Sequence, residues 1–288
     1  MPPVSRGPDV PTRTVLITGA SRGIGRATAL RLAARGWTVH AGVRSAADGE
    51  GLAAEGGANI VPVQLDITSA EDIAELAARL GPTLDALVNN AGIVVQGPVE
   101  TLSSDQVRLQ FEVNVVAQLA VTQSVLPLVR AGRGRVVFVS SISGRVSTPL
   151  SGAYNASKFA IEALADALRV ELRPWRVPVV LVQPSSTATD MWGTALEQHE
   201  AVITGLSPAH AQLYAQRLAK SAKAVAMIQK RAVPVERVAR TIETALTARR
   251  PRARYQVDAI GRAQLIGTAI TPTRVVDAVL ARATGFSR

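Results

Sequence analysis

The chain has 288 residues, of which 47% are hydrophobic and only 3% aromatic, and it carries a formal net charge of +10. It has no Cys and three scattered His, which excludes disulfides and thiolate metal sites and predicts no metal site. Only four of its 32 basic residues are lysines, so arginine supplies nearly all of the charge. Such a charge suits a compositional bias, an anionic cofactor, a membrane surface or nucleic acid.

The first 12 residues are Pro-rich and lack an apolar signal core. We expect them to form a disordered lead-in to a single catalytic domain that spans residues 13–288. The apolar runs in the rest of the chain are short, and none approaches the roughly 20 residues that span a bilayer. These features predict a cytoplasmic protein with no transmembrane segment and at most weak contact with a membrane surface.

The segment from residue 13 to residue 36 predicts a strand, a glycine-rich turn and a helix. The apolar run TVLI is followed by Gly19, Gly23 and Gly25 and then by a helical pattern that Gly36 can end. Such glycines let the backbone pass close to a bound group, and free N–H groups at a helix start attract an anion. A tight turn alone would show the same glycines, so their context must decide.

Residues 38–44 predict the second strand. At its end, a dinucleotide site holds either an acidic residue for the ribose hydroxyl or an arginine for a 2′-phosphate. This chain offers Arg44, with Arg22 nearby in the glycine turn, and no carboxylate until Asp48. Guanidinium groups suit a phosphate and gain little from a hydroxyl. The pair therefore predicts NADP rather than NAD, unless both side chains merely face solvent.

The third strand is predicted in ANIVPVQLDIT and the fourth in TLDALVNNAG. Asp66 would either meet an adenine or cap the next helix, a role that Ser69 could equally fill. Small residues after the fourth strand let backbone and cofactor approach. The long helix that follows carries Asn114 beside an apolar stripe. This amide could bridge a buried water or hold a water aimed at the active site.

GRVVFVSS and VPVVLVQP predict the fifth and sixth strands, with nearly continuous apolar residues as in parallel strands buried on both faces. Strands that alternate with helices indicate an α/β fold with a doubly wound (Rossmann) parallel sheet, in which ligands bind beyond the strand carboxyl ends. Four residues from separate strand ends lie there, namely Gly19, Asn90, Ser141 and Pro184. Their convergence predicts the position of the site.

Tyr154 and Lys158 stand four residues apart at the start of the helix after the fifth strand. This spacing places both side chains on one helix face, where an ammonium can act on a phenol oxygen. Ser141 ends the preceding strand. An isolated pair at this spacing is ordinary in helices, so its functional interpretation depends on the converging strand ends.

The pattern changes after Pro184. Residues from about 190 to 232 have helical spacing without a strand and predict a lid with an apolar inner side, or else a plain helix pair. RARYQVD predicts a last strand, and residues from about 258 to 288 a helical extension broken near Pro272. The arginines at 249, 250, 252 and 254 indicate a solvated face more than a contact with a membrane or acidic partner.

With these residues assembled, the chain resembles the short-chain dehydrogenase/reductase family over residues 13 to 190, and more loosely to about 260. TGASRGIG is similar to the family's cofactor turn, NNAG to its strand-four motif and YNASK to its Tyr-x-x-x-Lys. Ser141 precedes Tyr154 by thirteen residues, and Asn114 falls where the family's fourth catalytic residue lies. A shorter likeness in ALTARRPRARYQVD indicates the subgroup that acts on steroid-like, retinoid-like or other bulky apolar alcohols and ketones.

The resemblance implies a hydride transfer to or from a nicotinamide, with Tyr154 as the general acid/base. Lys158 would lower the phenol pKa and hold the ribose, Ser141 would bind the reacting oxygen, and Asn114 would order a relay water. The implied cofactor contacts are Gly19, Ser21, Arg22, Gly23, Ile24, Gly25, Arg44, Asp66, Ile67, Asn90, Ala91, Gly92, Tyr154, Lys158, Pro184, Ser185, Thr187 and Thr189. The implied substrate contacts are Ser143, Thr148, Leu150, Met191 and Trp192.

The chain departs from the family at Ser185, where Pro-Gly is usual after the sixth strand. If this position required a positive φ, a serine would be strained or the loop displaced, which would affect the contact expected at Thr187. The residues themselves leave the oligomeric state open. The family precedent implies a homodimer or homotetramer.

Two other classes of function stay open. The net charge and the basic segment 249–254 would suit a nucleotide-sensing or nucleic-acid-binding protein on the same fold, but the segment lacks interleaved aromatic residues. An epimerase or dehydratase can also use a Tyr-x-x-x-Lys pair and would keep its cofactor unchanged. The complete catalytic set favours an oxidoreductase whose small-molecule substrate is a bulky apolar alcohol or ketone, without a nucleic-acid partner.

Overall fold

The computed structural model describes residues 12–187, 202, 204–229 and 232–287 of the chain. The lead-in predicted for residues 1–12 falls almost wholly outside the described residues. The same is true of the first part of the predicted lid.

Seven parallel strands form one sheet in the order β3-β2-β1-β4-β5-β6-β7. Their bounds are β1 Thr14–Thr18, β2 Thr38–Val43, β3 Ile60–Gln64, β4 Ala86–Asn89, β5 Arg135–Val139, β6 Val179–Gln183 and β7 Arg254–Gln256. The order reverses direction between β1 and β4, which is the topological switch point of a doubly wound sheet. The predicted parallel α/β sheet is confirmed, including its last strand.

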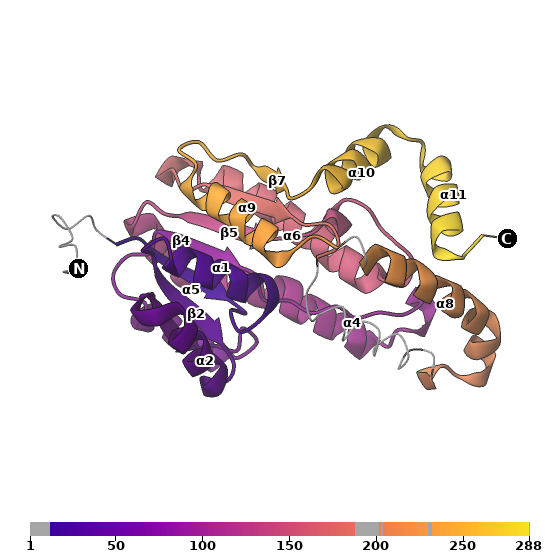
Figure 1. The fold of residues 1–288 in the computed structure, drawn as a ribbon, viewed down its shortest axis with the longest axis horizontal. Helices are drawn as coiled ribbons and strands as arrows, with labels where there is room; N and C mark the ends of the chain where they lie inside the picture. Colours follow the sequence, from indigo (N-terminus) through magenta and orange to yellow (C-terminus); the bar gives the residue numbers. More distant parts are fainter. Residues whose placement is uncertain (1–11, 188–201, 203, 230–231, 288) are drawn as a thin grey trace, which may run out of the picture.

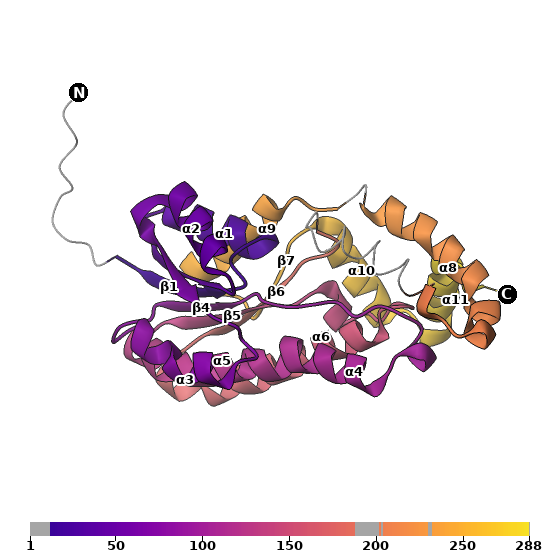
Figure 2. The same ribbon diagram turned by 90° about the horizontal axis from the view of Figure 1, so that it is seen from below.

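Helices cover both faces of the sheet (Figure 2). One face carries α1 Gly23–Ala33, α2 Ala46–Gly56 and α9 Val235–Thr247. The other carries α3 Ala70–Leu76, α4 Ser104–Phe111, α5 Ala117–Ala131 and α6 Gly152–Glu171. The π-turn η4 Glu112–Val116 joins α4 to α5. Short 3₁₀ turns are η1 Gly57–Asn59, η2 Ala77–Arg79, η3 Val99–Thr101, η5 Ile142–Gly144 and η6 Arg173–Trp175.

Three further helices gather at the end of the molecule to which the strand carboxyl ends point (Figures 1 and 2). They are α8 Pro208–Gln229, α10 Ala259–Ile270 and α11 Thr273–Thr284. The rings of Tyr214 in α8 and Phe286 after α11 lie 6.5 Å apart between centroids. The predicted break near Pro272 is confirmed, because α10 ends at Ile270 and Pro272 forms the N-cap of α11.

The central strands form because their apolar residues are buried on both faces of the sheet. Successive strand residues point to opposite faces. Val15 and Ile17 therefore pack toward the layer of α1 and α9, whereas Leu16 packs toward α5 and α6. All three are 0% exposed. The continuous apolar pattern thus follows from a sheet that is covered on both faces.

The helix from Ser104 to Ala131 is long and apolar enough to cross a membrane, with a mean hydropathy of 1.3 over its apolar window. The expectation that no segment of the chain reaches this threshold is therefore wrong. Half of that window is buried inside the fold. Because the core helix of a globular domain passes the same test, this helix is weak evidence for membrane insertion.

The predicted solvated arginine face is correct only in part. Arg249, Arg250 and Arg252 are exposed. Arg254 instead lies in β7, donates from Nε to Glu162 at 2.9 Å and pairs with Asp166 at 2.6 Å. The last strand is therefore fastened to helix α6, which carries Tyr154 and Lys158.

Candidate active site

The glycine turn after β1 has the backbone geometry that the sequence predicted. Gly19 and Gly23 have φ values of +64° and +55°. A Cβ on Gly25 would lie 2.1 Å from the carbonyl oxygen of Gly19, so no larger residue fits there. Helix α1 begins after Arg22 without a side-chain cap. Its first N–H groups are therefore left for an anion, and this cradle fits the pyrophosphate of a dinucleotide.

Asn90 and Thr18 join the end of β4 to this turn. The Asn90 side-chain amide donates to the carbonyl oxygens of Thr18 and Gly19, each at 3.0 Å. The Thr18 hydroxyl accepts the backbone amides of Asn90 and Ala91, also at 3.0 Å. Asn90 thus holds the turn in shape, in addition to the cofactor contact that is predicted for it. Thr18, which was not among the predicted site residues, thus holds the end of β4 against the glycine turn.

Arg22 and Arg44 are exposed and form no ion pair within the described part of the chain. Arg44 and two hydrogen bonds from Thr68 keep the pKa of Asp66 below its usual range, with the Thr68 hydroxyl as the larger cause. Ser69, rather than Asp66, caps α3 by accepting the amide of Asp72 at 3.1 Å. Of the two roles considered for Asp66, helix capping is therefore excluded.

Four buried polar side chains on the helix α4–η4–α5 face the segment that follows β4. This row, the amide ladder, consists of Gln110, Asn114, Gln118 and Thr122, spaced four residues apart and each at most 1% exposed. Four residues exceed one turn of a regular α-helix, so such a row would drift around the helix. The π-turn η4 closes i→i+5 bonds and holds more residues per turn. It offsets the drift and keeps the ladder on one face.

The ladder binds alternate residues of the chain from 89 to 95. The bonds join Gln110 Oε1 to the amide of Val95 at 2.7 Å, Asn114 Oδ1 to the amide of Ile93 at 2.9 Å, Gln118 Nε2 to the carbonyl of Ala91 at 2.7 Å, and Thr122 Oγ1 to the side-chain amide of Asn89 at 2.8 Å. Asn114 Nδ2 also reaches the hydroxyl of Ser157 at 3.2 Å. The predicted catalytic Asn114 is thus one of a set that positions the segment carrying Asn90, Ala91 and Gly92.

Ser141, Tyr154 and Lys158 lie together at the carboxyl end of β5. The Lys158 Nζ lies 5.8 Å from the Tyr154 ring centroid and donates to the carbonyl oxygen of Val139 at 3.0 Å. The hydroxyl of Ser141 forms a hydrogen bond with the Tyr154 phenol and lies 3.4 Å from the carbonyl oxygen of Pro184. Three predicted catalytic groups are therefore assembled by two elements, the η5 turn and helix α6.

Burial dominates the electrostatics of this pair. It raises the pKa of Tyr154, and the Ser141 hydrogen bond opposes this only in part. It also lowers the pKa of Lys158 to about 8, while the carboxylate of Glu162 acts in the opposite direction. The expected lowering of the phenol pKa by Lys158 together with an oxidised nicotinamide stays a prediction, because Lys158 is not among the causes of the shift in the chain alone. With its pKa raised, Tyr154 carries its proton at neutral pH.

Glu162 stands one turn beyond Lys158 on α6 and is only 3% exposed. It accepts from Arg254 Nε and from Gln183 Nε2, each at 2.9 Å. Gln183 in turn accepts from Gln256 at 3.0 Å. This buried network connects strands β6 and β7 to the ammonium of Lys158. Single-sequence reasoning missed it because its members are up to 92 residues apart.

The loop after β6 is not strained at Ser185. Among the described residues, only Arg133, Leu150 and Arg176 combine a side chain with positive φ, at 49°, 66° and 55°. The concern that a serine at 185 would be strained is therefore wrong, because the backbone here does not adopt the left-handed conformation. Thr187 is buried and donates its hydroxyl proton to the carbonyl oxygen of Ser185 at 3.2 Å.

The predicted substrate contacts are only partly visible. Ser143, in the turn η5, and Leu150, just before α6, are half-buried. The carbonyl oxygen of Thr148 accepts from the Asn155 side chain at 3.0 Å. Leu150 has a φ of +66°, a strained value for a branched side chain, and such strain is concentrated at functional sites. Thr189, Met191 and Trp192 lie outside the described residues.

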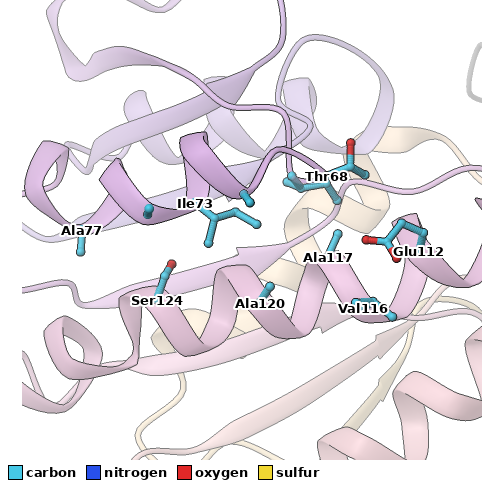
Figure 3. A pocket seen from close by; sticks show the side chains of 11 residues that line it. Thr68, Ile73, Ala77, Glu112, Val116, Ala117, Ala120 and Ser124 are labelled. Atoms are coloured by element: carbon cyan, nitrogen blue, oxygen red, sulfur yellow. The ribbon is translucent and has the colours of Figure 1, made fainter.

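A cavity of about 450 Å³ lies between α3 and α5 (Figure 3). Small side chains line it, including Ala77 and Ser124 on the two facing helices, with Glu112 at one end. It touches the predicted cofactor residues only at Ile67. A second cavity of about 320 Å³ lies beside β7 and α10. Neither cavity includes Ser141, Tyr154 or Lys158.

Within the described ranges, no group of three His, Cys, Asp or Glu side chains is placed to hold a metal ion. The predicted site residues supply a phenol, an ammonium and a hydroxyl at the switch point of a doubly wound sheet, beside a turn shaped for phosphate. This combination defines a dinucleotide-dependent oxidoreductase.

The chain belongs to the short-chain dehydrogenase/reductase family, whose model, described as short chain dehydrogenase, matches residues 13–200. It is 35% identical over 257 residues to the NADPH-dependent 3-dehydrocapnine reductase of Ornithobacterium rhinotracheale, covering 85% of this chain and 88% of that protein. It is 33% identical over 282 residues to retinol dehydrogenase 5 of Mus musculus, covering 92% and 87%. A short chain dehydrogenase structure from Burkholderia cenocepacia J2315 in complex with NADP matches with a TM-score of 0.73 and 26% identity, covering 93% and 97%.

Proposed function

We propose that the protein is an NADP(H)-dependent oxidoreductase that interconverts an alcohol and its ketone or aldehyde on a bulky apolar substrate. The observation that carries this proposal is the grouping of Ser141, Tyr154 and Lys158 at the strand end next to the dinucleotide turn. A regulatory protein would have no use for these groups in this arrangement.

Bound NADP(H) would supply the hydride chemistry, held at its pyrophosphate by the turn Gly19–Gly25 and at its nicotinamide end by Lys158 and the loop after β6. The Ser141 hydroxyl donates a hydrogen bond to the reacting oxygen and fixes it beside the phenol. In reduction, Tyr154 gives its proton to that oxygen as negative charge develops. The Lys158 ammonium stabilises the phenolate that remains. Oxidation uses the same groups in reverse.

The preference for NADP rests on Arg44 and Arg22, which are exposed and without an ion pair in the described residues. Relatives named or solved with NADPH or NADP support it. Replacing Arg44 with Ala should raise the Kd for NADP⁺ about tenfold, because a charge-assisted contact to phosphate is lost, and leave the Kd for NAD⁺ unchanged. Titration followed by protein fluorescence measures both constants, with the exposed Arg249→Ala as the control.

The apolar substrate class is supported by the likeness to retinol dehydrogenase 5 and to the subgroup indicated by the sequence. The helices at the open end of the sheet are placed to border such a substrate (Figure 2). Leu213, within the predicted lid, is 55% exposed, so it does not contribute an apolar wall. The hydroxyl of Tyr214 instead pairs with Glu100.

We also propose a cytoplasmic homodimer or homotetramer, with at most weak contact with a membrane surface. Two neighbouring helices expose large apolar side chains that a partner copy could cover. Leu109 and Val116 on the α4–α5 helix are 53% and 51% exposed, and Phe159 and Val170 on α6 are 42% and 60% exposed. Light scattering at several concentrations measures the assembly state.

A panel of apolar ketones, aldehydes and alcohols, followed by NADPH and NADH absorbance, tests the proposed activity. We expect NADPH oxidation with at least one ketone or aldehyde and slower oxidation of NADH. Tyr154→Phe controls for non-enzymatic oxidation. Cofactor that stays unchanged while substrate is converted would instead indicate an epimerase or dehydratase. Salt-sensitive nucleic-acid binding without any NADPH oxidation would reject the proposal.

A further inference from the structure

The loop after β6, which we define as residues 184–187, is fastened to three separate parts of the chain. The carbonyl oxygen of Pro184 accepts the amide of Ile142 at 3.0 Å, in the turn that follows Ser141. The carbonyl oxygen of Ser186 accepts the amide of Val233 at 2.8 Å, just before α9. The third connection, through the Ser185 side chain, leads to the C-terminal extension.

One carboxylate makes this third connection. Asp258 accepts the Ser185 hydroxyl on Oδ2 at 2.5 Å and the amide of Gly261 on Oδ1 at 2.7 Å. The second bond makes Asp258 the N-cap of α10. The same side chain therefore starts a helix of the C-terminal extension and holds the loop at the end of β6. Both bonds are to an ionised acceptor, which makes them stronger than neutral hydrogen bonds.

Helix α10 has few other attachments to the domain. Gly261 is its only buried residue. A Cβ there would lie 3.4 Å from the Cβ of Ser185 and 3.2 Å from a methyl group of Ile142. Three large apolar residues of the helix face outward, since Ile260, Ile266 and Ile270 are 68%, 54% and 79% exposed, and Leu265 is only half-buried. The position of α10 therefore depends strongly on the contacts of its first turn.

We propose that Ser185 and Asp258 are positioning residues that couple dinucleotide binding at the loop after β6 to the docking of α10. The proposal rests on the proposed function, because it takes the nicotinamide end of the cofactor to lie against this loop. A cofactor that orders residues 184–187 fixes the Ser185 hydroxyl, and through Asp258 it fixes the first turn of α10. By linkage, docking of α10 strengthens cofactor binding by the same factor.

The coupling depends on a side chain at position 185. A glycine, which the resembling family usually has there, would leave one oxygen of Asp258 unpaired and the loop free of the extension. The serine therefore adds a connection without changing the backbone, in agreement with the ordinary φ at this position. The consequence is that this enzyme's C-terminal extension responds to its cofactor.

Hydrogen exchange of residues 259–270, with and without saturating NADP⁺, tests the coupling together with the Kd for NADP⁺. In the wild-type protein we expect NADP⁺ to slow exchange in α10 about fivefold, at the lower end of usual coupling factors. In Ser185→Ala and Ser185→Gly we expect fast exchange that NADP⁺ does not change, and a Kd raised by the same factor of about five. In Asp258→Asn, which keeps a capping side chain, we expect a smaller change in the same direction.

Ser104→Ala is the matched control, because it removes an exposed hydroxyl at the start of α4, away from the cofactor loop, that makes no hydrogen bond in the described structure, and it should behave as wild type. Exchange in α10 that ignores NADP⁺ in the wild-type protein would overturn the proposal. So would a Ser185→Ala variant in which exchange rises equally with and without NADP⁺ while the Kd stays constant. If the wild-type protein binds no NADP⁺ at all, the proposed function fails before any variant is compared.

Discussion

Two regions at the same end of the molecule differ in how many buried side chains hold them in place. The strand-end region, made of the turns after β1, β4, β5 and β6, has its backbone groups bound by buried side chains such as Thr18 and Gln118. The C-terminal helices α10 and α11 contain one buried residue between them, Gly261. Their apolar side chains are largely exposed, as Ile270 and Val279 are at 79% and 59%.

This difference separates two tasks. The proposed chemistry at a nicotinamide needs a proton donor and an oxygen-binding hydroxyl in fixed positions, and the many independent bonds of the strand-end region would hold them there. Helices with few buried contacts open at low free energy. We infer that the C-terminal helices are the part that adjusts to the substrate and responds to the cofactor. The following predictions test each region, from the largest expected effect to the smallest.

Removing the Tyr154 hydroxyl should have the largest effect. Tyr154→Phe should lower kcat by about 10² to 10⁴, the usual contribution of a general acid, because the variant lacks the phenol proton that the proposed mechanism gives to the reacting oxygen. The Kd for NADP⁺ should change little, since the phosphate turn is intact. Steady-state rates and NADP⁺ titration measure the two quantities. Normal turnover in the variant would show that the strand-end chemistry is assigned to the wrong group.

The buried Lys158 should make stability depend on pH. Its pKa is lowered by burial to about 8 in the folded chain. Between pH 8 and its unfolded value near 10.5, the unfolded state therefore binds more protons, and stability rises with pH. Relative to Lys158→Met, the wild-type protein should gain up to about 3 kcal/mol over this window. Urea unfolding from pH 7 to pH 10 measures it, and the exposed Lys220→Met should show no such trend.

The amide ladder should matter for both stability and cofactor binding. Gln118→Leu leaves the carbonyl oxygen of Ala91 without its partner, which costs about 1 to 3 kcal/mol of unfolding free energy. Because Ala91 stands beside the glycine turn, NADP⁺ affinity should fall as well. Gln123→Leu is the matched control, since Gln123 is exposed on the same helix. Equal stability of the two variants would show that the amide ladder does not stabilise the fold.

The smallest effect is expected in the C-terminal helices. Ile270→Ala should change the unfolding free energy by less than about 0.5 kcal/mol, because the side chain is 79% exposed. Leu181→Ala, in β6 and 0% exposed, should cost about 2 to 5 kcal/mol. Urea unfolding of both variants measures the contrast directly. A large loss in Ile270→Ala would mean that α10 is packed against a partner in solution, and the two regions would no longer differ as described.

The sheet and the strand ends could be predicted because their signals are local. Continuous apolar runs such as VVLVQ indicate buried strands, and the glycines of the first turn indicate a close approach of the backbone to a ligand. Neither signal requires knowledge of distant residues. The positions of Ser141, Tyr154 and Lys158 relative to one another follow from helix geometry and from where parallel strands end. For these reasons the fold class was confirmed, and the structure brings Ser141, Tyr154 and Lys158 together, whereas their catalytic roles stay a prediction.

The rest could not be predicted because it depends on partners far away in the sequence. Glu162 and Arg254 are 92 residues apart, and Ser185 and Asp258 are 73 apart. The strain expected at Ser185 came from a resemblance and not from its own backbone, which has an ordinary conformation. The amide ladder carried a local signal, which is four polar residues at a spacing of four. These residues lie on one helix face only because of the π-turn at Glu112–Val116, which the sequence did not indicate.

Hydrogen exchange of the wild-type protein with and without NADP⁺, mapped over all described residues, tests the central claim most directly. The account predicts slower exchange at three separate strand ends together: the turn at 18–25, the segment at 89–92 and the loop at 184–187. It predicts no change around the cavity between α3 and α5 near Ala77 and Ser124. Protection confined to the basic segment 249–254, or no protection anywhere, would contradict a dinucleotide site at the strand ends.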